Sequence, residues 1–105
     1  MISAERVEAA IHFLCDTDSD VAYAEGEVMR LERKIERIKD NLYLSEDGTV
    51  PERKAKANRH PEVAVLEDEY VDALVKFKTL KAKRDTARVE IEVWRSFESS
   101  RRAGV

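Results

Sequence analysis

The stretch from Val21 to Leu42, VAYAEGEVMRLERKIERIKDNL, decides the fold. Its apolar residues recur at alternating intervals of three and four positions, as Val21, Ala24, Val28, Leu31, Ile35, Ile38 and Leu42. This spacing lines them up along one side of an α-helix, as in a coiled coil. The stretch therefore predicts a long helix over residues 19–43 with one continuous apolar seam.

A second stretch further along the chain repeats the pattern. The same three-and-four spacing gives Leu66, Tyr70, Ala73, Phe77, Leu80, Arg84, Ala87, Ile91 and Trp94. Arg84 is the exception in an otherwise apolar series. We predict a helix over residues 61–99 whose seam faces the seam of the first long helix.

The remaining segments are predicted to be shorter elements. Val7, Ala10, Ile11 and Leu14 give one apolar face and predict a short helix within residues 1–15, which the run Asp16-Thr-Asp-Ser-Asp20 is expected to end. Residues 44–61 form a charged connection, with a turn at Gly48 and a short helix expected from Pro51 to about Asn58. The tail beyond Ser99 is expected to fray.

These elements predict one all-α domain over residues 1–105. Charged residues make up 39% of the chain, with 3 Gly and 2 Pro, which is typical of long helices. The fold class is a long antiparallel, coiled-coil-like helical hairpin with a short N-terminal helix. A lone pair of helices buries little, so we expect self-association into a homo-oligomer. The residues expected to mediate it are Leu31, Ile35, Ile38, Phe77, Leu80, Ile91, Trp94 and Phe97.

Several kinds of chemistry fit the sequence poorly. Asp16, Asp18 and Asp20 imitate a calcium loop, but Val21 occupies the position that needs glycine. His12, Cys15 and Asp16 could supply metal ligands, but the one other strong ligand, His60, is distant in sequence, so such a site would be incomplete. Cys15 is instead interpreted as a small buried residue at a helix end. No nucleophile–base pair or phosphate loop appears. We expect no enzyme activity, metal or cofactor.

The N-terminus has no signal-peptide pattern, and no apolar run is long enough to cross a membrane. We therefore expect no membrane contact. One cysteine fits a reducing compartment, so we expect the cytoplasm, of the host if the chain is phage-encoded.

Charge is segregated in blocks, although the net charge is −3. Residues 16–27 and 62–72 are acidic, whereas the basic residues near the connection should gather at one tip of the hairpin. Such a cluster could bind phosphate backbones, and Tyr43 could stack on a base. The alternative is a solvated face without a ligand. The predicted contacts are Arg33, Lys34, Arg37, Lys39, Arg53, Lys54, Lys56 and Arg59.

Over residues 28–98 the chain resembles the UvsY family of phage recombination mediators. The similarity lies in Ile91, Trp94-Arg95 and Phe97 near the end of a long helix. It also lies in a preceding helix, rich in Arg and Lys over residues 33–39, that ends in Leu42-Tyr43-Leu44 before a loop with Gly48. The resemblance implies a ring-like homo-oligomer that binds single-stranded DNA and helps load a recombinase onto strands coated by single-strand-binding protein. It carries DNA contacts over to Arg33, Lys34, Arg37 and Lys39, whereas the contacts at residues 53–59 rest on charge alone.

Two functional hypotheses follow. The first is a non-enzymatic recombination accessory protein that oligomerises and binds single-stranded DNA. The second is a protein-only interaction module, such as a phage inhibitor of a host nuclease or defence complex, or a coiled-coil structural adaptor. In the second hypothesis the acidic blocks would be the functional surface.

Overall fold

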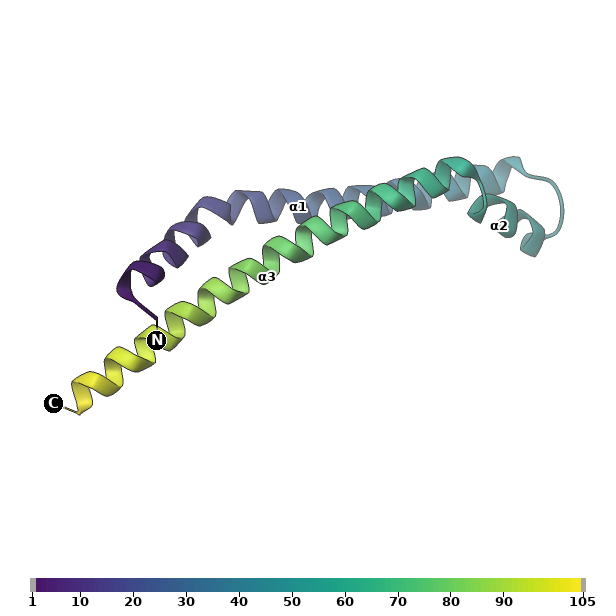
Figure 1. Cartoon of the computed structure of the whole chain (residues 1–105). Coiled ribbons are helices and arrows are strands. Elements are labelled where there is room, and N and C mark those ends of the chain that lie inside the picture. Colours follow the sequence, from purple (N-terminus) through teal and green to yellow (C-terminus); the bar gives the residue numbers. More distant parts are fainter. Residues whose placement is uncertain (1, 105) are drawn as a thin grey trace. The chain divides into compact units, whose positions relative to one another are not determined.

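The computed structural model describes residues 2–104, and they form three α-helices without a strand. Helix α1 spans Ala4–Ser45, α2 spans Val50–Asn58 and α3 spans Pro61–Ala103 (Figure 1). The predicted all-α class is confirmed. The contacts gather in two compact units. The central unit is Ala24–Phe77, and the terminal unit combines the chain up to Tyr23 with the chain from Lys78 onward. The prediction of one domain stays a prediction.

In the central unit the two long helices pack side by side through the predicted seams. Leu31 and Ile35 of α1 form a buried cluster with Leu66 of α3, and Tyr70 packs against it. Within this unit the helices are antiparallel, since α1 runs towards α2 and α3 runs back from α2 beside α1 (Figure 1). Lys39 of α1 pairs with Glu67 of α3 at 3.4 Å. The predicted antiparallel seam is therefore confirmed in this unit.

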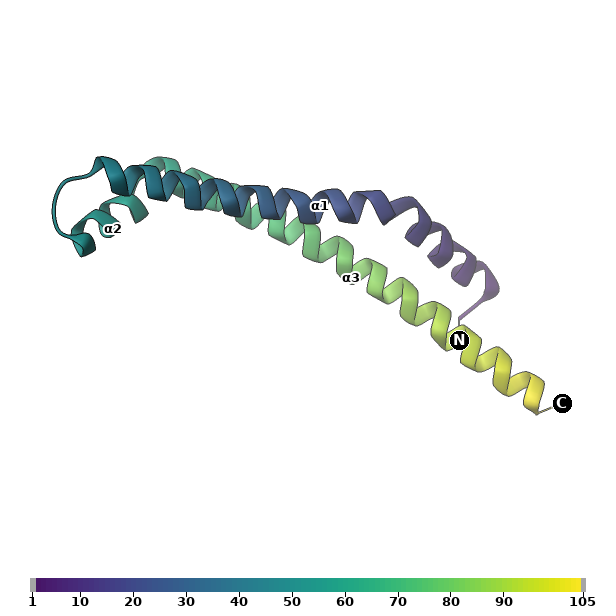
Figure 2. The same ribbon diagram turned by 180° about the vertical axis from the view of Figure 1, so that it is seen from behind.

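Helix α2 lies beside the end of α1, as the view from behind shows (Figure 2). It begins with a capping box: the Thr49 hydroxyl accepts from the Glu52 amide at 3.4 Å, and the Glu52 carboxylate accepts from the Thr49 amide at 3.1 Å. Pro51 stands in the first turn, as the sequence predicts. Ala57 of α2 and Val63 of α3 are the most buried residues of this corner.

The turn before α2 depends on Gly48. Its φ is +117°, a conformation that residues with a side chain rarely adopt. A Cβ there would also collide with the Glu52 carboxylate of the capping box. We predict that Gly48→Ala lowers the free energy of unfolding by about 1–2 kcal/mol, measured by urea denaturation. Gly26→Ala is the matched control, because a Cβ at this helical glycine of α1 meets only ordinary contacts, and it should not lower stability. An unchanged Gly48→Ala variant would contradict the described turn.

The predicted helix break at Asp16–Asp20 is wrong, because α1 continues through this run. The physical reason is a buried arginine of the terminal unit. The guanidinium of Arg84 donates to the Leu14 carbonyl at 2.8 Å, to the Thr17 hydroxyl at 2.6 Å and to the Asp18 carboxylate at 2.6 Å. The Thr17 hydroxyl in turn donates to the Phe13 carbonyl at 2.7 Å. Polar side chains that could have terminated the helix are thus occupied in contacts that leave it intact.

Two polar residues of this contact, Thr17 and Arg84, stand on the seams. In α1 the three-and-four spacing runs without interruption from Val7 through Thr17 to Leu42, and none of its positions is exposed. In α3 the predicted seam from Leu66 to Trp94 is likewise buried or half-buried throughout, including Arg84 at 6% exposure. Arg84, the exception in the predicted apolar series, is therefore a core residue whose partner on the α1 seam is Thr17.

Other boundaries differ modestly from the predicted ones. Helix α1 ends at Ser45 rather than at residue 43, and α3 continues to Ala103 rather than ending near Ser99. Arg101 pairs with Glu98 at 2.6 Å in the segment expected to fray. Ile11, predicted on the apolar face, is 47% exposed, because the α1 seam passes through Ala10 and Leu14 instead.

Candidate nucleic-acid interface

A stripe of exposed cations follows one side of α1 in the central unit. Its members lie at positions i, i+3, i+4 and i+7, so they share one helix face. We name this the basic stripe, and it consists of Arg30, Arg33, Lys34 and Arg37. The stripe lies away from the seam, because Leu31 and Ile35, between its members in sequence, are buried. The fold thus presents a compact line of positive charge to solvent.

Most of the stripe is free to bind an anion. Arg30 pairs with Glu27 at 2.9 Å. Within residues 2–104, the side chains of Arg33, Lys34 and Arg37 form no hydrogen bond or ion pair. An incoming phosphate therefore displaces no ion pair at these three positions, and released counterions favour binding.

Lys39 does not belong to the basic stripe, although the sequence grouped it with Arg33, Lys34 and Arg37. It lies on a different side of α1, where its ammonium group pairs with Glu67 of α3. Its side chain is 33% exposed. A single surface through all four predicted cations of α1 is thus absent from the central unit.

The predicted cations near α2 are mostly engaged within the chain. Arg53 donates to the Tyr43 carbonyl at 3.1 Å, and its guanidinium lies 4.6 Å from the centre of the Tyr43 ring. Lys56 donates to the Asp47 carbonyl at 3.3 Å, and Arg59 donates to the Ala55 carbonyl at 3.2 Å. Exposed Lys54 has no such side-chain contact within residues 2–104. These contacts occupy hydrogen-bond donors of Arg53, Lys56 and Arg59 within the chain, so these donors are less available to a ligand.

The sequence interpretation missed Arg30. The signal was present, since Arg30 precedes Arg33, Lys34 and Arg37 at helical spacing. The basic residues of α3 give no comparable stripe. Arg84 is buried and Arg88 pairs with Asp85 at 3.0 Å, whereas exposed Lys83 lies on another side of that helix than Lys78 and Lys81.

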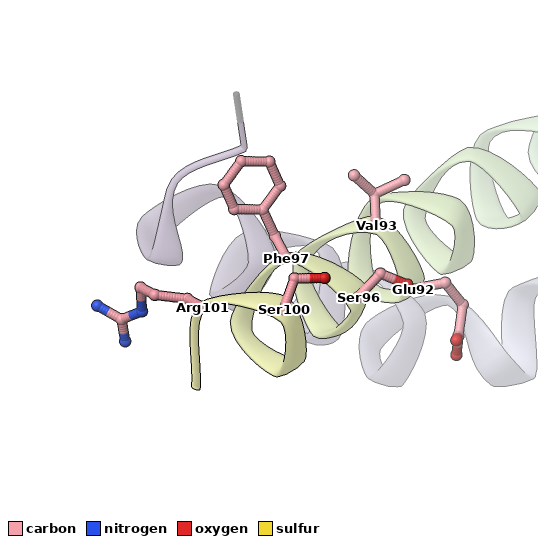
Figure 3. Close-up of a pocket in the computed structure, with 6 residues that line it drawn as sticks. All are labelled: Glu92, Val93, Ser96, Phe97, Ser100 and Arg101. Carbon is pink, nitrogen blue, oxygen red and sulfur yellow. The ribbon is translucent and has the colours of Figure 1, made fainter. Parts of the chain in front are cut away.

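The residues predicted to mediate oligomerisation are mostly covered within the chain. Leu31 and Ile35 are buried, and half-buried side chains occur at Ile38, Phe77, Leu80, Ile91 and Trp94. Phe97 is 53% exposed, because it is displaced from the seam. It lies with Val93 on one side of α3, and both side chains line a shallow groove together with Ser96 and Ser100 (Figure 3). Val89, one turn earlier, is also exposed, so Val89, Val93 and Phe97 form an outer apolar face.

The predicted buried position of Cys15 is wrong, because Cys15 is exposed in the middle of α1. Asp16, Asp18 and Asp20 lie on a helix rather than in a loop, and Asp18 binds Arg84. Among residues 2–104 there is no cluster of three or more His, Cys, Asp or Glu side chains that could hold a metal ion. In the same range no helix has the length and apolar character needed to cross a membrane.

The chain matches no protein-family model, no curated protein and no solved structure.

Proposed function

We propose that this protein is a non-enzymatic accessory protein that binds single-stranded DNA through the basic stripe. The observation that carries the proposal is the exposed line of Arg33, Lys34 and Arg37, which have no ionic partner within residues 2–104. Cations in such a line suit a chain of phosphates, because each contact releases a bound counterion.

The distribution of charge favours a narrow contact. The chain carries a net charge of −3, and acidic residues such as Glu32 and Glu36 occupy another side of α1. A nucleic acid that wrapped around the helix would meet these carboxylates. The stripe runs over eight residues, Arg30 to Arg37, about 10 Å of helix, which suits a short length of one strand. The resemblance to the UvsY family gives such a contact a role in loading a recombinase onto strands coated by single-strand-binding protein.

Charge removal on the stripe tests the proposal. We expect the triple variant Arg33→Gln, Lys34→Gln, Arg37→Gln to bind a fluorescently labelled single-stranded oligonucleotide at least tenfold more weakly than the wild type at about 50 mM salt. Fluorescence anisotropy measures the dissociation constant. The matched control, Lys78→Gln, Lys81→Gln, Lys83→Gln, removes the same charge from more than one side of α3 and should change affinity far less. Equal losses in the two variants would show attraction by overall charge and reject the stripe.

A homo-oligomer is the second part of the proposal. The seam residues are occupied within the chain, so a second copy would use the outer apolar face of α3. Val89, Val93 and Phe97 recur every four positions, a spacing suited to helix packing, and are 59%, 44% and 53% exposed. We expect Val93→Glu to lower the molar mass measured by light scattering, whereas Val65→Glu, at another exposed valine, should leave it unchanged. A wild-type protein that is monomeric at high concentration would contradict this part.

The outer apolar face also favours the second candidate function, a protein-only interaction module. That candidate predicts no affinity for oligonucleotides at low salt. The anisotropy measurement therefore separates the two functions directly.

A further inference from the structure

A groove opens between α1 and α2 in the central unit. Lys39, Asp40 and Tyr43 of α1 line it, together with Lys54 and Asn58 of α2. Its volume is about 480 Å³, within the range of about 300–1,000 Å³ that is usual for small-ligand sites. The lining combines an aromatic ring, two ammonium groups, a carboxylate and an amide with the apolar side chains of Val50 and Ala57, and this mixture of polar and apolar groups suits a nucleotide.

The Tyr43 ring is held in place by Arg53. The guanidinium covers the ring at 4.6 Å from its centre, and its Nε donates to the Tyr43 carbonyl at 3.1 Å. Arg53 therefore acts as a positioning residue for Tyr43. Because the ring is fixed by a neighbour and also lines the groove, a base could stack on it without first having to order it.

The polar groups of the groove select the edge of the base. The Asp40 carboxylate accepts hydrogen bonds, so it favours a base edge rich in donors. The exocyclic amino groups of cytosine, adenine and guanine supply such donors, whereas the one donor of thymine, its ring N3–H, stands between two carbonyl oxygens that repel a carboxylate. Lys54 stands in the same groove and can contact a flanking phosphate, whereas Lys39 at the edge of the groove is paired with Glu67.

The groove continues the basic stripe along α1. Asp40 follows Arg37 by three residues, which is one helical turn, and Tyr43 follows Asp40 by one more turn. A strand whose phosphates contact the stripe can therefore reach the groove without leaving the helix. We propose that the groove between α1 and α2 takes one unstacked base with an exocyclic amino group from the strand bound along the basic stripe. This inference rests on the proposed function.

The test uses the full chain and three labelled ten-residue oligonucleotides, made of cytidine, adenosine or thymidine deoxynucleotides. By fluorescence anisotropy, we expect the wild type to bind the thymidine oligonucleotide about fivefold or more weakly than the cytidine one. Tyr43→Leu should weaken binding of the cytidine oligonucleotide about fivefold or more, because the stacking surface is lost. Tyr43→Phe keeps the ring and should bind like the wild type. Asp40→Asn should remove the preference for cytidine over thymidine, since an amide also donates.

Tyr23→Leu is the matched control, because Tyr23 is an exposed tyrosine of α1 outside this groove. It should bind as the wild type does. Circular dichroism establishes that each variant keeps its helix content. Equal wild-type affinity for all three oligonucleotides, or unchanged binding by Tyr43→Leu, would overturn the base site and leave the stripe standing. Failure of every oligonucleotide to bind the wild type would overturn the stripe and the base site together.

Discussion

Arg84→Ala should lower the free energy of unfolding by about 3 kcal/mol, because it removes a buried charge-assisted hydrogen-bond network. The side chain of Arg84 is 7% exposed, and its guanidinium contacts Leu14, Thr17 and Asp18 in the terminal unit. Its loss leaves a cavity and a half-buried Thr17 hydroxyl without its donor. The Asp18 carboxylate is 70% exposed, so its share of the loss is small. Urea denaturation followed by circular dichroism measures the change.

Arg88→Ala is the matched control, because Arg88 lies one turn further along α3 but is exposed and pairs with Asp85 on the same helix. Such an exposed pair contributes about 0.5 kcal/mol or less. A double replacement, Thr17→Leu with Arg84→Leu, should restore much of the lost stability, since an apolar layer often replaces a buried polar one at little cost. A loss below about 1 kcal/mol for Arg84→Ala would contradict the buried network.

Leu66→Ala is the second large effect that we expect. Leu66 is 5% exposed and completes the cluster of Leu31 and Ile35 where α1 and α3 meet in the central unit. Truncation of a leucine in such a core lowers the free energy of unfolding by about 2–4 kcal/mol, through lost burial and the remaining cavity. The same denaturation experiment measures it.

The neighbouring Val65 provides the control for this substitution. It is 59% exposed on the same turn of α3, so Val65→Ala should change stability by no more than about 0.5 kcal/mol. Similar losses for Leu66→Ala and Val65→Ala would mean that the side chains of α3 are not divided into a buried seam and an exposed face.

The seams could be predicted because their information is local and periodic. Leu31, Ile35 and Leu66 fall where three-and-four spacing places them, and the packing of the helices depends on that spacing alone. The helix break at Asp16–Asp20 was predicted wrongly because its outcome depends on a residue far away in the chain. Arg84 supplies the partner for Thr17 and Asp18, and no local propensity describes a contact across that separation.

The candidate interface was predictable to a similar extent. Arg33, Lys34 and Arg37 share a helix face by spacing, and the same rule would have added Arg30. The engagement of Arg53 and Lys56 could not be predicted, because their partners are backbone carbonyls whose positions depend on the turn before α2. Lys39 was grouped with Arg33, Lys34 and Arg37 because a count of charges along the chain does not distinguish the sides of a helix. Its ammonium group lies on the side of α1 that contacts Glu67 of α3.

The salt dependence of single-stranded DNA binding tests the central claim most directly. For the wild type we expect the logarithm of the binding constant for a labelled oligonucleotide to fall linearly with the logarithm of salt concentration, with a slope of about −2 or steeper, since Arg33, Lys34 and Arg37 supply three phosphate contacts. The Arg33→Gln, Lys34→Gln, Arg37→Gln variant should show a slope that is shallower by about 2. No binding at about 50 mM salt, or wild-type binding that does not change with salt, would contradict the account.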